Sequence, residues 1–230
     1  MALTKAAIDR LGDRLRSEEL APDDVDAYHA LRSTMLEELA AVHLTVTNLG
    51  VELLRAGTRL KTLESTRAKL RRSTTKLSQM QDLAGCRATV LDLDAQDRLT
   101  ERIVDHFQVV RHYDLRDRPR CGYRAIHVVV RTPAGPVELQ LRTRFQDSWA
   151  NHSERLSERF GLEVKYCGGP PWVRRYLDWL AETGRQGEDL ERMAARISGS
   201  GAAGAEGKSL HELAMSIVNA FSQVPLEWEE

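Results

Sequence analysis

Residues 137–143 read VELQLRT, and this stretch decides how the chain folds. Side chains of a β-strand alternate between its two faces, so the apolar residues at 137, 139 and 141 share one face. The opposite face holds the carboxylate of Glu138, the amide of Gln140 and the guanidinium of Arg142. One apolar and one polar face predict a strand that covers a core and presents a candidate site.

A second strand with polar side chains comes shortly before it, YRAIHVVV at residues 123–130. The connecting residues 132–136, TPAGP, are rich in turn formers and predict an antiparallel hairpin. Such a hairpin can bring Tyr123 and His127 onto the surface that holds the polar side chains of residues 138, 140 and 142. An aromatic ring and an imidazole would then lie beside opposite charges, which again indicates a site.

The composition limits the classes of protein that fit. The chain has 230 residues, is 42% hydrophobic and has a formal net charge of −1. These values predict one α/β domain with additions at each end, or at most two small domains, and exclude a polycation. Cys86, Cys121 and Cys167 lie far apart, so we expect no disulfide and a reducing, cytoplasmic location. No apolar run reaches the ~18 residues of a membrane span, so no membrane partner is expected.

Periodicity and turn residues predict alternating helices and strands in the middle of the chain, the pattern of an α/β fold. We expect helices at 3–17, 24–46, 62–77, 95–106, 144–160 and from the Pro-rich break to about 192, and further strands at 58–62, 86–93 and 107–113. Thr62 is the expected N-cap of the third helix. The Gly- and Ala-rich residues 199–207 predict a flexible linker, followed by an amphipathic helix at about 209–221.

The third of these helices is strongly basic. Between positions 59 and 76 the chain has seven basic residues and one acidic residue. Lys61, Ser65 and Lys69 are four residues apart, and Arg72 and Lys76 continue the stripe, so five hydrogen-bond donors would follow one helix face. The free N–H groups at the helix N-terminus add a positive end. The stripe suits a polyanion such as a triphosphate; a solvated basic face is the alternative.

Two carboxylates stand on other elements near this basic segment. Asp82 begins the turn DLAGCR at 82–87, and Glu138 lies on the hairpin strand. In phosphate sites Mg²⁺ takes one or two carboxylates, and phosphate oxygens and water complete its shell. The two carboxylates therefore predict a Mg²⁺–phosphate site. A capping role for Asp82 and a cross-strand ion pair for Glu138 are the open alternatives.

Four motifs, in this order, resemble the synthetase domain of RelA/SpoT-type alarmone synthetases. RLKTLESTRAKL at 59–70 resembles the ATP-binding signature of that family, and DLAGCR at 82–87 resembles its Mg²⁺-binding turn. The loop at 113–119 is similar to the family's loop before the acceptor hairpin, which GYRAIH at 122–127 and ELQLRT at 138–143 resemble. Each motif alone is weak, but the ordered set is specific.

The resemblance implies an α/β (α+β) fold in which helices flank a mixed β-sheet, related to nucleotidyltransferases and extended by N- and C-terminal helices. It implies a GTP diphosphokinase that moves the β,γ-diphosphate of ATP to the 3′-OH of GDP or GTP, makes (p)ppGpp and releases AMP. The implied cofactor is Mg²⁺. The site residues that the resemblance implies are, for ATP, Arg59, Lys61, Ser65, Lys69 and Arg87; for the metal and catalysis, Asp82 and Glu138; and for the acceptor, Tyr123, Arg124, His127, Gln140 and Arg142.

The expected organisation is helices at 1–50, a synthetase core at 51–167, a helix at 168–198, a linker at 199–208 and a terminal helix and tail at 209–230. The histidine and aspartate motifs of a metal phosphohydrolase are missing, so we expect a small, synthetase-only member. Whether the terminal helices drive formation of a homo-oligomer is left open.

The match weakens after position 150, where SER at 153–155 stands in place of the family's Glu-His-Lys step. Because this edge is expected near the acceptor, the identity of the acceptor stays open. One alternative is a toxin-type relative, with an antitoxin as partner, that pyrophosphorylates the 3′ end of tRNA or makes adenosine alarmones. The other is a non-catalytic nucleotide- or RNA-binding module, although both metal carboxylates are present. The basic path that tRNA would need could come from Arg116, Arg118, Arg120, Arg174 and Arg175, but Asp114, Asp117 and Glu163 dilute this positive charge.

Overall fold

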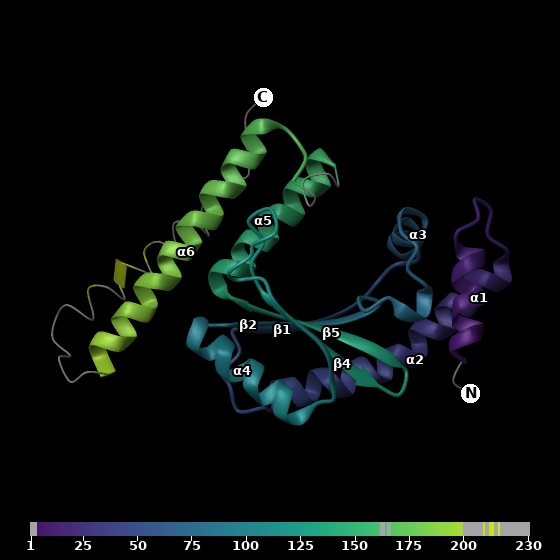
Figure 1. Ribbon diagram of the computed structural model, residues 1–230, viewed down its shortest axis with the longest axis horizontal. Helices are drawn as coiled ribbons and strands as arrows, with labels where there is room; N and C mark the ends of the chain where they lie inside the picture. Colours follow the sequence, from purple (N-terminus) through teal and green to yellow (C-terminus); the bar gives the residue numbers. More distant parts are fainter. Residues whose placement is uncertain are drawn as a thin grey trace. The chain divides into compact units, whose positions relative to one another are not determined.

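The computed structural model describes residues 4–161, 164, 167–199, 209, 212–213 and 216. Helices and strands alternate through the middle of the chain (Figure 1). In chain order the elements are α1 (Lys5–Leu15), α2 (Pro22–Thr47), β1 (Arg55–Leu60), α3 (Leu63–Arg72), the 3₁₀ turn η1 (Leu77–Gln79), β2 (Ala84–Val90), α4 (Leu93–His106), β3 (Val109–Asp114), β4 (Ile126–Thr132), β5 (Gly135–Thr143), α5 (Arg144–Phe160) and α6 (Pro171–Gly199).

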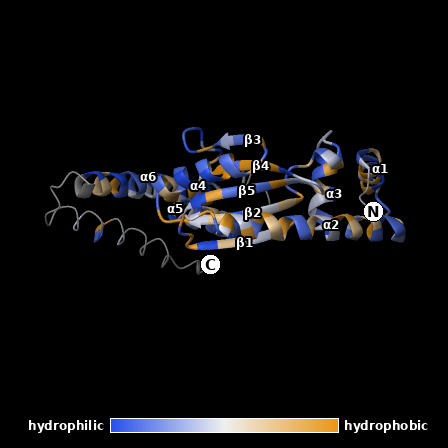
Figure 2. Ribbon diagram, turned by 90° about the horizontal axis from the view of Figure 1, so that it is seen from below, coloured by the Kyte–Doolittle hydropathy of each residue, from blue (hydrophilic) through white to orange (hydrophobic). Residues whose placement is uncertain are grey.

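The five strands form one sheet in the order β1-β2-β5-β4-β3, and Figure 2 shows them edge to edge in this order. The neighbours β4 and β5 are separated only by Pro133 and Ala134, and a connection this short requires an antiparallel pair. The sheet is mixed and helices flank it, so the expected fold class is confirmed. The expected hairpin is confirmed with it.

Strand β5 has the two faces that its sequence predicts. Val137, Leu139 and Leu141 are each at most 1% exposed, whereas Glu138 and Gln140 on the opposite face are half-buried. The apolar face therefore belongs to the core, whereas the polar face is mixed, because its third member, Arg142, is only 3% exposed.

The chain forms two compact units, residues 1–88, 99–113 and 127–140 in the first and residues 89–98, 114–126 and 141–230 in the second. In the first unit, α2 packs against β1 and presents buried residues at helical spacing, Tyr28, Leu31, Met35, Leu39, Val42 and Val46. In the second, α5 packs against α6, and Trp149 donates its Nε1–H to the carbonyl of Leu177 at 2.9 Å. Each unit thus has a core of its own.

Several element boundaries differ from expectation. The helix at 144–160 and the N-cap role of Thr62 are confirmed, since Thr62 Oγ1 accepts from the backbone N–H of Ser65 at 3.2 Å. The third helix, however, ends at Arg72 rather than at 77, because Ser73 takes an extended conformation and two threonines follow it. Gly199, the first residue of the expected linker, ends the last long helix instead, while the rest of the linker and most of the final helix lie outside the described residues.

Strand β4 also begins later than expected, at Ile126, so Tyr123 and Arg124 precede the strand. Cys121 and Gly122 have φ values of 56° and 86°, in the left-handed region. The turn closes with two backbone hydrogen bonds between Arg120 and Tyr123. A left-handed turn cannot continue the pleat of a strand, which explains the late start.

Candidate functional site

The segment around the start of α3 is fixed by buried contacts in the first unit. The backbone N–H of Lys61 donates to the carbonyl of Leu83 at 2.8 Å, next to β2. The buried hydroxyl of Tyr28, from α2, lies 2.6 Å from Thr66 Oγ1 and donates to the carbonyl of Lys61 at 2.9 Å. The backbone that carries Lys61 and Ser65 is therefore held on two sides.

Two lysines converge on one carboxylate. Lys69 Nζ donates to one oxygen of Asp82 at 2.7 Å, and Lys61 Nζ donates to the other at 3.0 Å. Burial alone would raise the pKa of Asp82, but the two ammonium groups outweigh it and hold this pKa below its ordinary value. The cluster of Lys61, Lys69 and Asp82 is thus an ionised site with one surplus positive charge, and Ser65 lies between the two lysines on the chain. A phosphate group or a metal-bound phosphate matches that charge.

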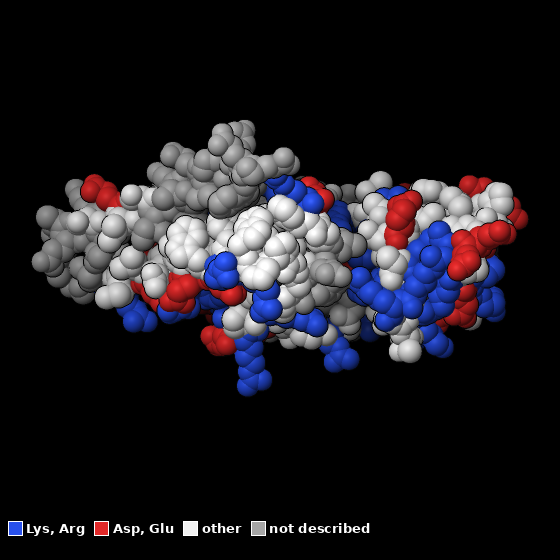
Figure 3. Space-filling view, turned by 90° about the horizontal axis from the view of Figure 1, so that it is seen from above, with Lys and Arg blue, Asp and Glu red and all other residues white. Residues whose placement is uncertain are grey.

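Other basic residues of α3 have structural partners. Arg67 and Arg71 donate to backbone carbonyls at the end of α1, with Nη2 of each reaching the carbonyl of Ser17, at 2.7 Å and 2.5 Å. In return Arg16 donates to the carbonyls of Leu70, Ser73 and Thr75 at the end of α3. Figure 3 shows Lys and Arg side chains gathered over the α1 and α3 part of the first unit, with Asp and Glu among them.

The expected stripe of five donors on one helix face is therefore wrong in part. Lys61 precedes the N-cap, and Lys76 lies beyond Ser73, where the helix has ended. Only Ser65, Lys69 and Arg72 of the stripe are in α3. Lys61 still reaches the same carboxylate as Lys69, because the strand end and the first helical turn place it there.

A second cluster lies on the hairpin of the first unit. Glu138 Oε1 lies 3.1 Å from Nδ1 of His127, and Glu138 Oε2 accepts from Gln140 Nε2 at 2.8 Å. Burial alone would raise the pKa of Glu138, but the imidazole and the amide lower it below its ordinary value, while the charge of Asp82 acts in the opposite direction. Asp82 and Glu138 therefore both stay ionised at neutral pH, and each is influenced by nearby charge.

Asp82 and Glu138 are the residues here that could hold a divalent cation. Ionised carboxylates are the ligands that Mg²⁺ prefers, and two of them suffice when phosphate oxygens complete the shell. Among the residues that the structure describes, no three His, Cys, Asp or Glu side chains gather as a metal site would require.

The two expected adenine ligands lie on neighbouring strands. Arg59 is exposed near the end of β1, and Arg87 is half-buried in β2. An added Cβ on Gly85 of β2 would lie 3.9 Å from the carbonyl oxygen of Arg59, an ordinary van der Waals contact.

In the second unit, Tyr123 and Arg142 meet. Arg142 Nη2 donates to the hydroxyl of Tyr123 at 3.2 Å, and its guanidinium carbon lies 5.4 Å from the centre of the tyrosine ring. Nη1 of Arg142 donates to Asp147 at 3.1 Å. Burial alone would lower the pKa of Arg142, but Tyr123 and Asp147 raise it, so the side chain stays charged. The ring and the guanidinium predicted to share a site are brought together, although Tyr123 is outside the strand.

Two residues that contact the acceptor-side residues of the second unit were not predicted from the sequence. Asp147 orients Arg142 from the first turn of α5, and an acid in that position was the signal that could have revealed it. Glu188 of α6 accepts from Arg124 Nη1 at 2.5 Å. Nothing in the sequence pattern links two residues 64 positions apart, so Glu188 could not have been found without the fold.

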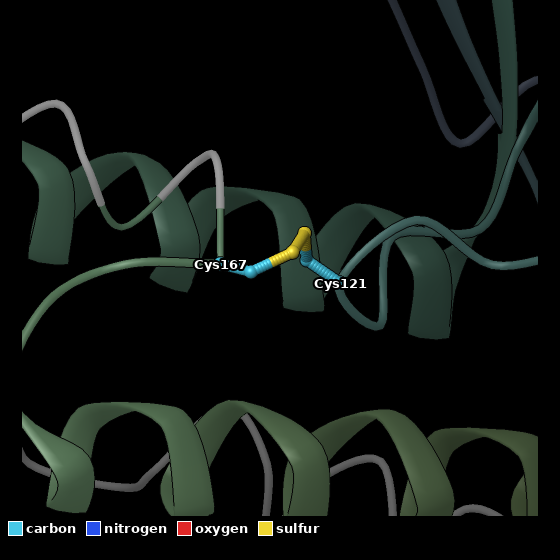
Figure 4. Close-up of a disulfide and its surroundings, with 2 residues drawn as sticks. All are labelled: Cys121 and Cys167. Carbon is cyan, nitrogen blue, oxygen red and sulfur yellow. A yellow bond between two sulfur atoms is a disulfide. The ribbon is translucent and has the colours of Figure 1, made fainter.

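The expectation that the cysteines form no disulfide is wrong. Cys121, in the turn before Tyr123, is joined to Cys167, in the connection between α5 and α6 (Figure 4). Their Cα atoms are 5.3 Å apart, and both residues have positive φ. The two turns, 46 residues apart, thus bring together thiols that spacing alone does not pair. Cys86 is buried and free, and burial raises the pKa of its thiol to about 11.

Among the described helices, none is both long and apolar enough to cross a lipid bilayer.

The chain is similar to known proteins in sequence. Residues 58–157 match the family described as the region found in RelA / SpoT proteins. The uncharacterized proteins Rv1366 of Mycobacterium tuberculosis (strain H37Rv) and Mb1401 of Mycobacterium bovis are each 37% identical to it over 170 residues, which is 71% of this chain. The chain spans 62% of the length of these relatives.

The fold is also similar to solved structures. Small alarmone synthetase 1 from Bacillus subtilis aligns with a TM-score of 0.63 and 24% identity, over 79% of this chain and 100% of the other. Small alarmone synthetase 2 from the same organism aligns with a TM-score of 0.62 and 20% identity, over 72% and 95%. The first of these has also been solved bound to its product pppGpp. Residues 58–157 thus match the region found in RelA / SpoT proteins, and the chain has the fold of these small alarmone synthetases.

Proposed function

We propose that the chain is an ATP-dependent pyrophosphokinase that makes (p)ppGpp from GDP or GTP. The observation that best supports the proposal is the convergence of Lys61 and Lys69 on Asp82, at the start of the matched region and on a fixed backbone. Phosphoryl transfer requires neutralisation of phosphate charge and alignment of the reacting groups more than covalent help. A preformed pair of ammonium groups beside an ionised carboxylate supplies the first of these.

In the proposed reaction, the 3′-oxygen of the acceptor attacks the β-phosphorus of ATP. The bond between that phosphorus and the α,β-bridging oxygen breaks, AMP leaves with the bonding electrons, and the 3′-hydroxyl loses its proton. The products are AMP, a nucleotide with a 3′-diphosphate and the proton released to solvent, which together account for every atom of both substrates.

Each cluster has a role in this proposal. Lys61, Ser65 and Lys69 bind the phosphates of ATP, and Arg59 and Arg87 stack on its adenine, since guanidinium planes stack well on purines. Tyr123 stacks on the acceptor base, with the remaining acceptor-side residues positioning the acceptor, Arg124, His127, Gln140 and Arg142. Asp82 and Glu138 would hold Mg²⁺, which when bound neutralises charge on the transferred diphosphate.

Glu138 is the candidate base for the 3′-hydroxyl. Its pKa lies below the ordinary value, which makes it a weak base at neutral pH. We infer that its main contribution is to orient the hydroxyl by accepting its hydrogen bond, with His127 and Gln140 fixing the carboxylate. Glutamine at this position would still fit the space but would lose the charge.

The test uses purified chain, Mg²⁺ and ATP labelled at the γ-phosphate. GDP, GTP, AMP, ATP and deacylated tRNA are offered separately, and the products are resolved. Label on guanine nucleotides supports the proposal; label on tRNA or adenine nucleotides alone would replace it with the toxin-type alternative. Tyr123→Ala provides the acceptor control: it should raise KM for the acceptor and leave KM for ATP nearly unchanged, and an equal rise in both would argue against stacking.

We also propose a cytoplasmic location; the bond between Cys121 and Cys167 counts against it, because stable disulfides are uncommon in the cytoplasm. Intact mass of the chain isolated with its thiols blocked would show whether Cys121 and Cys167 are joined there.

A further inference from the structure

A buried carboxylate on α6 contacts the motif that precedes β4. The side chain of Glu188 is fully buried, and its Oε2 accepts from Arg124 Nη1 at 2.5 Å. Arg124 is itself only 13% exposed. Charges this deeply buried persist only when they are paired and hydrogen-bonded, so the two side chains depend on each other.

The second oxygen of Glu188 is bound as well. Oε1 accepts from Thr143 Oγ1 at 2.5 Å and from Gln146 Nε2 at 2.8 Å. Thr143 and Gln146 form the capping box of α5, in which each side chain accepts from the other's backbone N–H. Glu188 therefore joins the end of β5 and the start of α5 to the turn that holds Arg124.

These partners are the direct neighbours of the acceptor-side pair. Arg124 follows Tyr123 in the chain, and Thr143 follows Arg142. One carboxylate thus fixes the residue next to the ring and the residue next to the guanidinium that contacts it. Packing alone would not require a buried carboxylate at position 188, because an apolar side chain of similar volume could fill the same space.

The other end of the turn is held by a second arginine. Arg116 Nη1 donates to Asp97 at 2.6 Å, and its Nη2 donates to Asp114 at the same distance. The backbone carbonyl of Arg116 accepts from Arg124 Nε at 3.1 Å. Arg124 therefore ties the two sides of the segment 116–124 together, and Glu188 sets where Arg124 lies.

We infer that Glu188 is a positioning residue for the acceptor: it holds Arg124, and through it the turn that presents Tyr123. It lies outside residues 58–157, the part of the chain that matches the family. The inference rests on the proposed function only in that Tyr123 is taken to bind the acceptor. A helix beyond the matched region would thereby contribute to acceptor affinity without contacting the acceptor.

The test compares Glu188→Gln with Glu191→Gln in the full chain. Glu191 is one helical turn further along α6, is 8% exposed and pairs with Arg144, which is not part of the acceptor motif. Glu188→Gln should raise KM for the acceptor about tenfold and change KM for ATP less than twofold. Glu191→Gln should lower the melting temperature to a similar extent and leave both KM values within twofold. Equal changes in the two KM values, or an unchanged acceptor KM in Glu188→Gln, would overturn the inference.

A double-mutant cycle decides whether the effect passes through Arg124. Arg124→Gln combined with Glu188→Gln should raise the acceptor KM no more than Arg124→Gln alone, because the ion pair is already lost in that variant. Additive effects would show that Glu188 does not act through Arg124. If Glu188→Gln does not fold, Glu188→Asp with the same readouts takes its place, and a smaller but still acceptor-specific rise is expected.

Hydrogen exchange of the ligand-free chain separates this inference from the proposed function. Peptides covering 115–125 should exchange faster in Glu188→Gln than in wild type and in Glu191→Gln. A wild-type chain that transfers no diphosphate to any acceptor would refute the proposed function, while the exchange data would still show whether Glu188 holds the turn. Unchanged exchange in Glu188→Gln would refute the inference whether or not the chain is active.

Discussion

Asp82→Asn should make the chain less stable and, at the same time, increase its affinity for metal-free ATP. One carboxylate accepts from two ammonium groups, at 2.7 Å and 3.0 Å, and asparagine of nearly the same size removes its charge. Lys61 and Lys69 then keep their charge but lose their common partner. The same substitution therefore affects folding and binding in opposite directions.

The loss of stability follows from how far the cluster is desolvated. The side chain of Asp82 is 27% exposed and that of Lys61 is 12% exposed. A hydrogen bond between charged groups contributes about 1.5–3 kcal/mol, and the amide oxygen of asparagine retains part of one bond, so we expect a loss of about 2 kcal/mol. For a chain of this size that lowers Tm by about 4–8 °C.

The dependence of this loss on pH has a defined sign. Asp82 has a lower pKa in the folded chain than in the unfolded chain, so its contribution is present above the unfolded value of ~3.9. The contribution is lost as the pH falls through the folded value. The difference in stability between wild type and Asp82→Asn should therefore be constant between about pH 5 and pH 8 and shrink in acid below about pH 4.

The gain in ATP affinity follows from Coulomb's law. A unit charge about 5 Å from a phosphate repels it by about 1–3 kcal/mol at effective dielectric constants of about 20–60. Without that repulsion, metal-free ATP should bind at least about fivefold more tightly, as measured by titration calorimetry in EDTA at low salt. With Mg²⁺ present, diphosphate transfer should be lost.

Asp24→Asn is the control for these experiments. Asp24 lies on α2 and pairs with Arg14 at 2.6 Å, so its loss removes an ion pair of the first unit without freeing either lysine. Its melting temperature should fall slightly, because Arg14 is half exposed, and its affinity for ATP should not change. A folded Asp82→Asn that binds metal-free ATP more weakly than wild type would refute the assignment of the two lysines to phosphate.

Three further changes test other parts of the structure. Glu138→Gln should retain ATP binding in calorimetry and lose at least about 100-fold in kcat; near-normal turnover would remove Glu138 from the reaction. Replacing Cys121 and Cys167 by serine should lower the free energy of unfolding by about 2–4 kcal/mol for a loop of this length. A reductant should lower the Tm of wild type to that of the variant. Equal wild-type Tm values with and without reductant would show that the disulfide does not contribute to stability. Gly187→Ala would place a Cβ against the ring of Phe145, closer than a normal contact, and should cost about 1–3 kcal/mol in denaturant unfolding. A neutral result would mean that the packing of α6 on α5 accommodates the added methyl group.

The sequence was sufficient where local rules decide the structure. Alternation in 137–143 predicted the buried and polar faces of β5, and Thr62 was identified as an N-cap because its side chain can accept from the helix N-terminus. The hairpin was predicted from the turn formers at residues 132–136 between two strands. Spacing also placed Lys61 and Lys69 near one another, although the helix that was expected to join the whole basic stripe ends four residues before Lys76.

Pairings between residues far apart in the chain could not be predicted from the sequence. Cys121 and Cys167 meet because two left-handed turns bring their Cα atoms to 5.3 Å, and a hydropathy pattern contains no information about such turns. Glu188 is one of several acids on a polar-looking helix, and a charge on a helix is usually solvated. Only the packing of α6 in the second unit distinguishes it from its neighbours, by burying it completely.

The arginines at the end of α1 and on α3 donate hydrogen bonds to each other's backbone carbonyls, and this has a consequence for how the chain is handled in the laboratory. Arg67 and Arg71 are occupied by carbonyls at the end of α1. A shortened form that begins after residue 20 would release both guanidinium groups and would also remove Arg16 from the end of α3. Such a form would bind nucleic acid non-specifically and in a salt-dependent manner. The two guanidinium groups would no longer donate to backbone carbonyls and would be available to bind phosphate. RNA that copurifies with a trimmed chain would then reflect the trimming rather than the biology of the full chain.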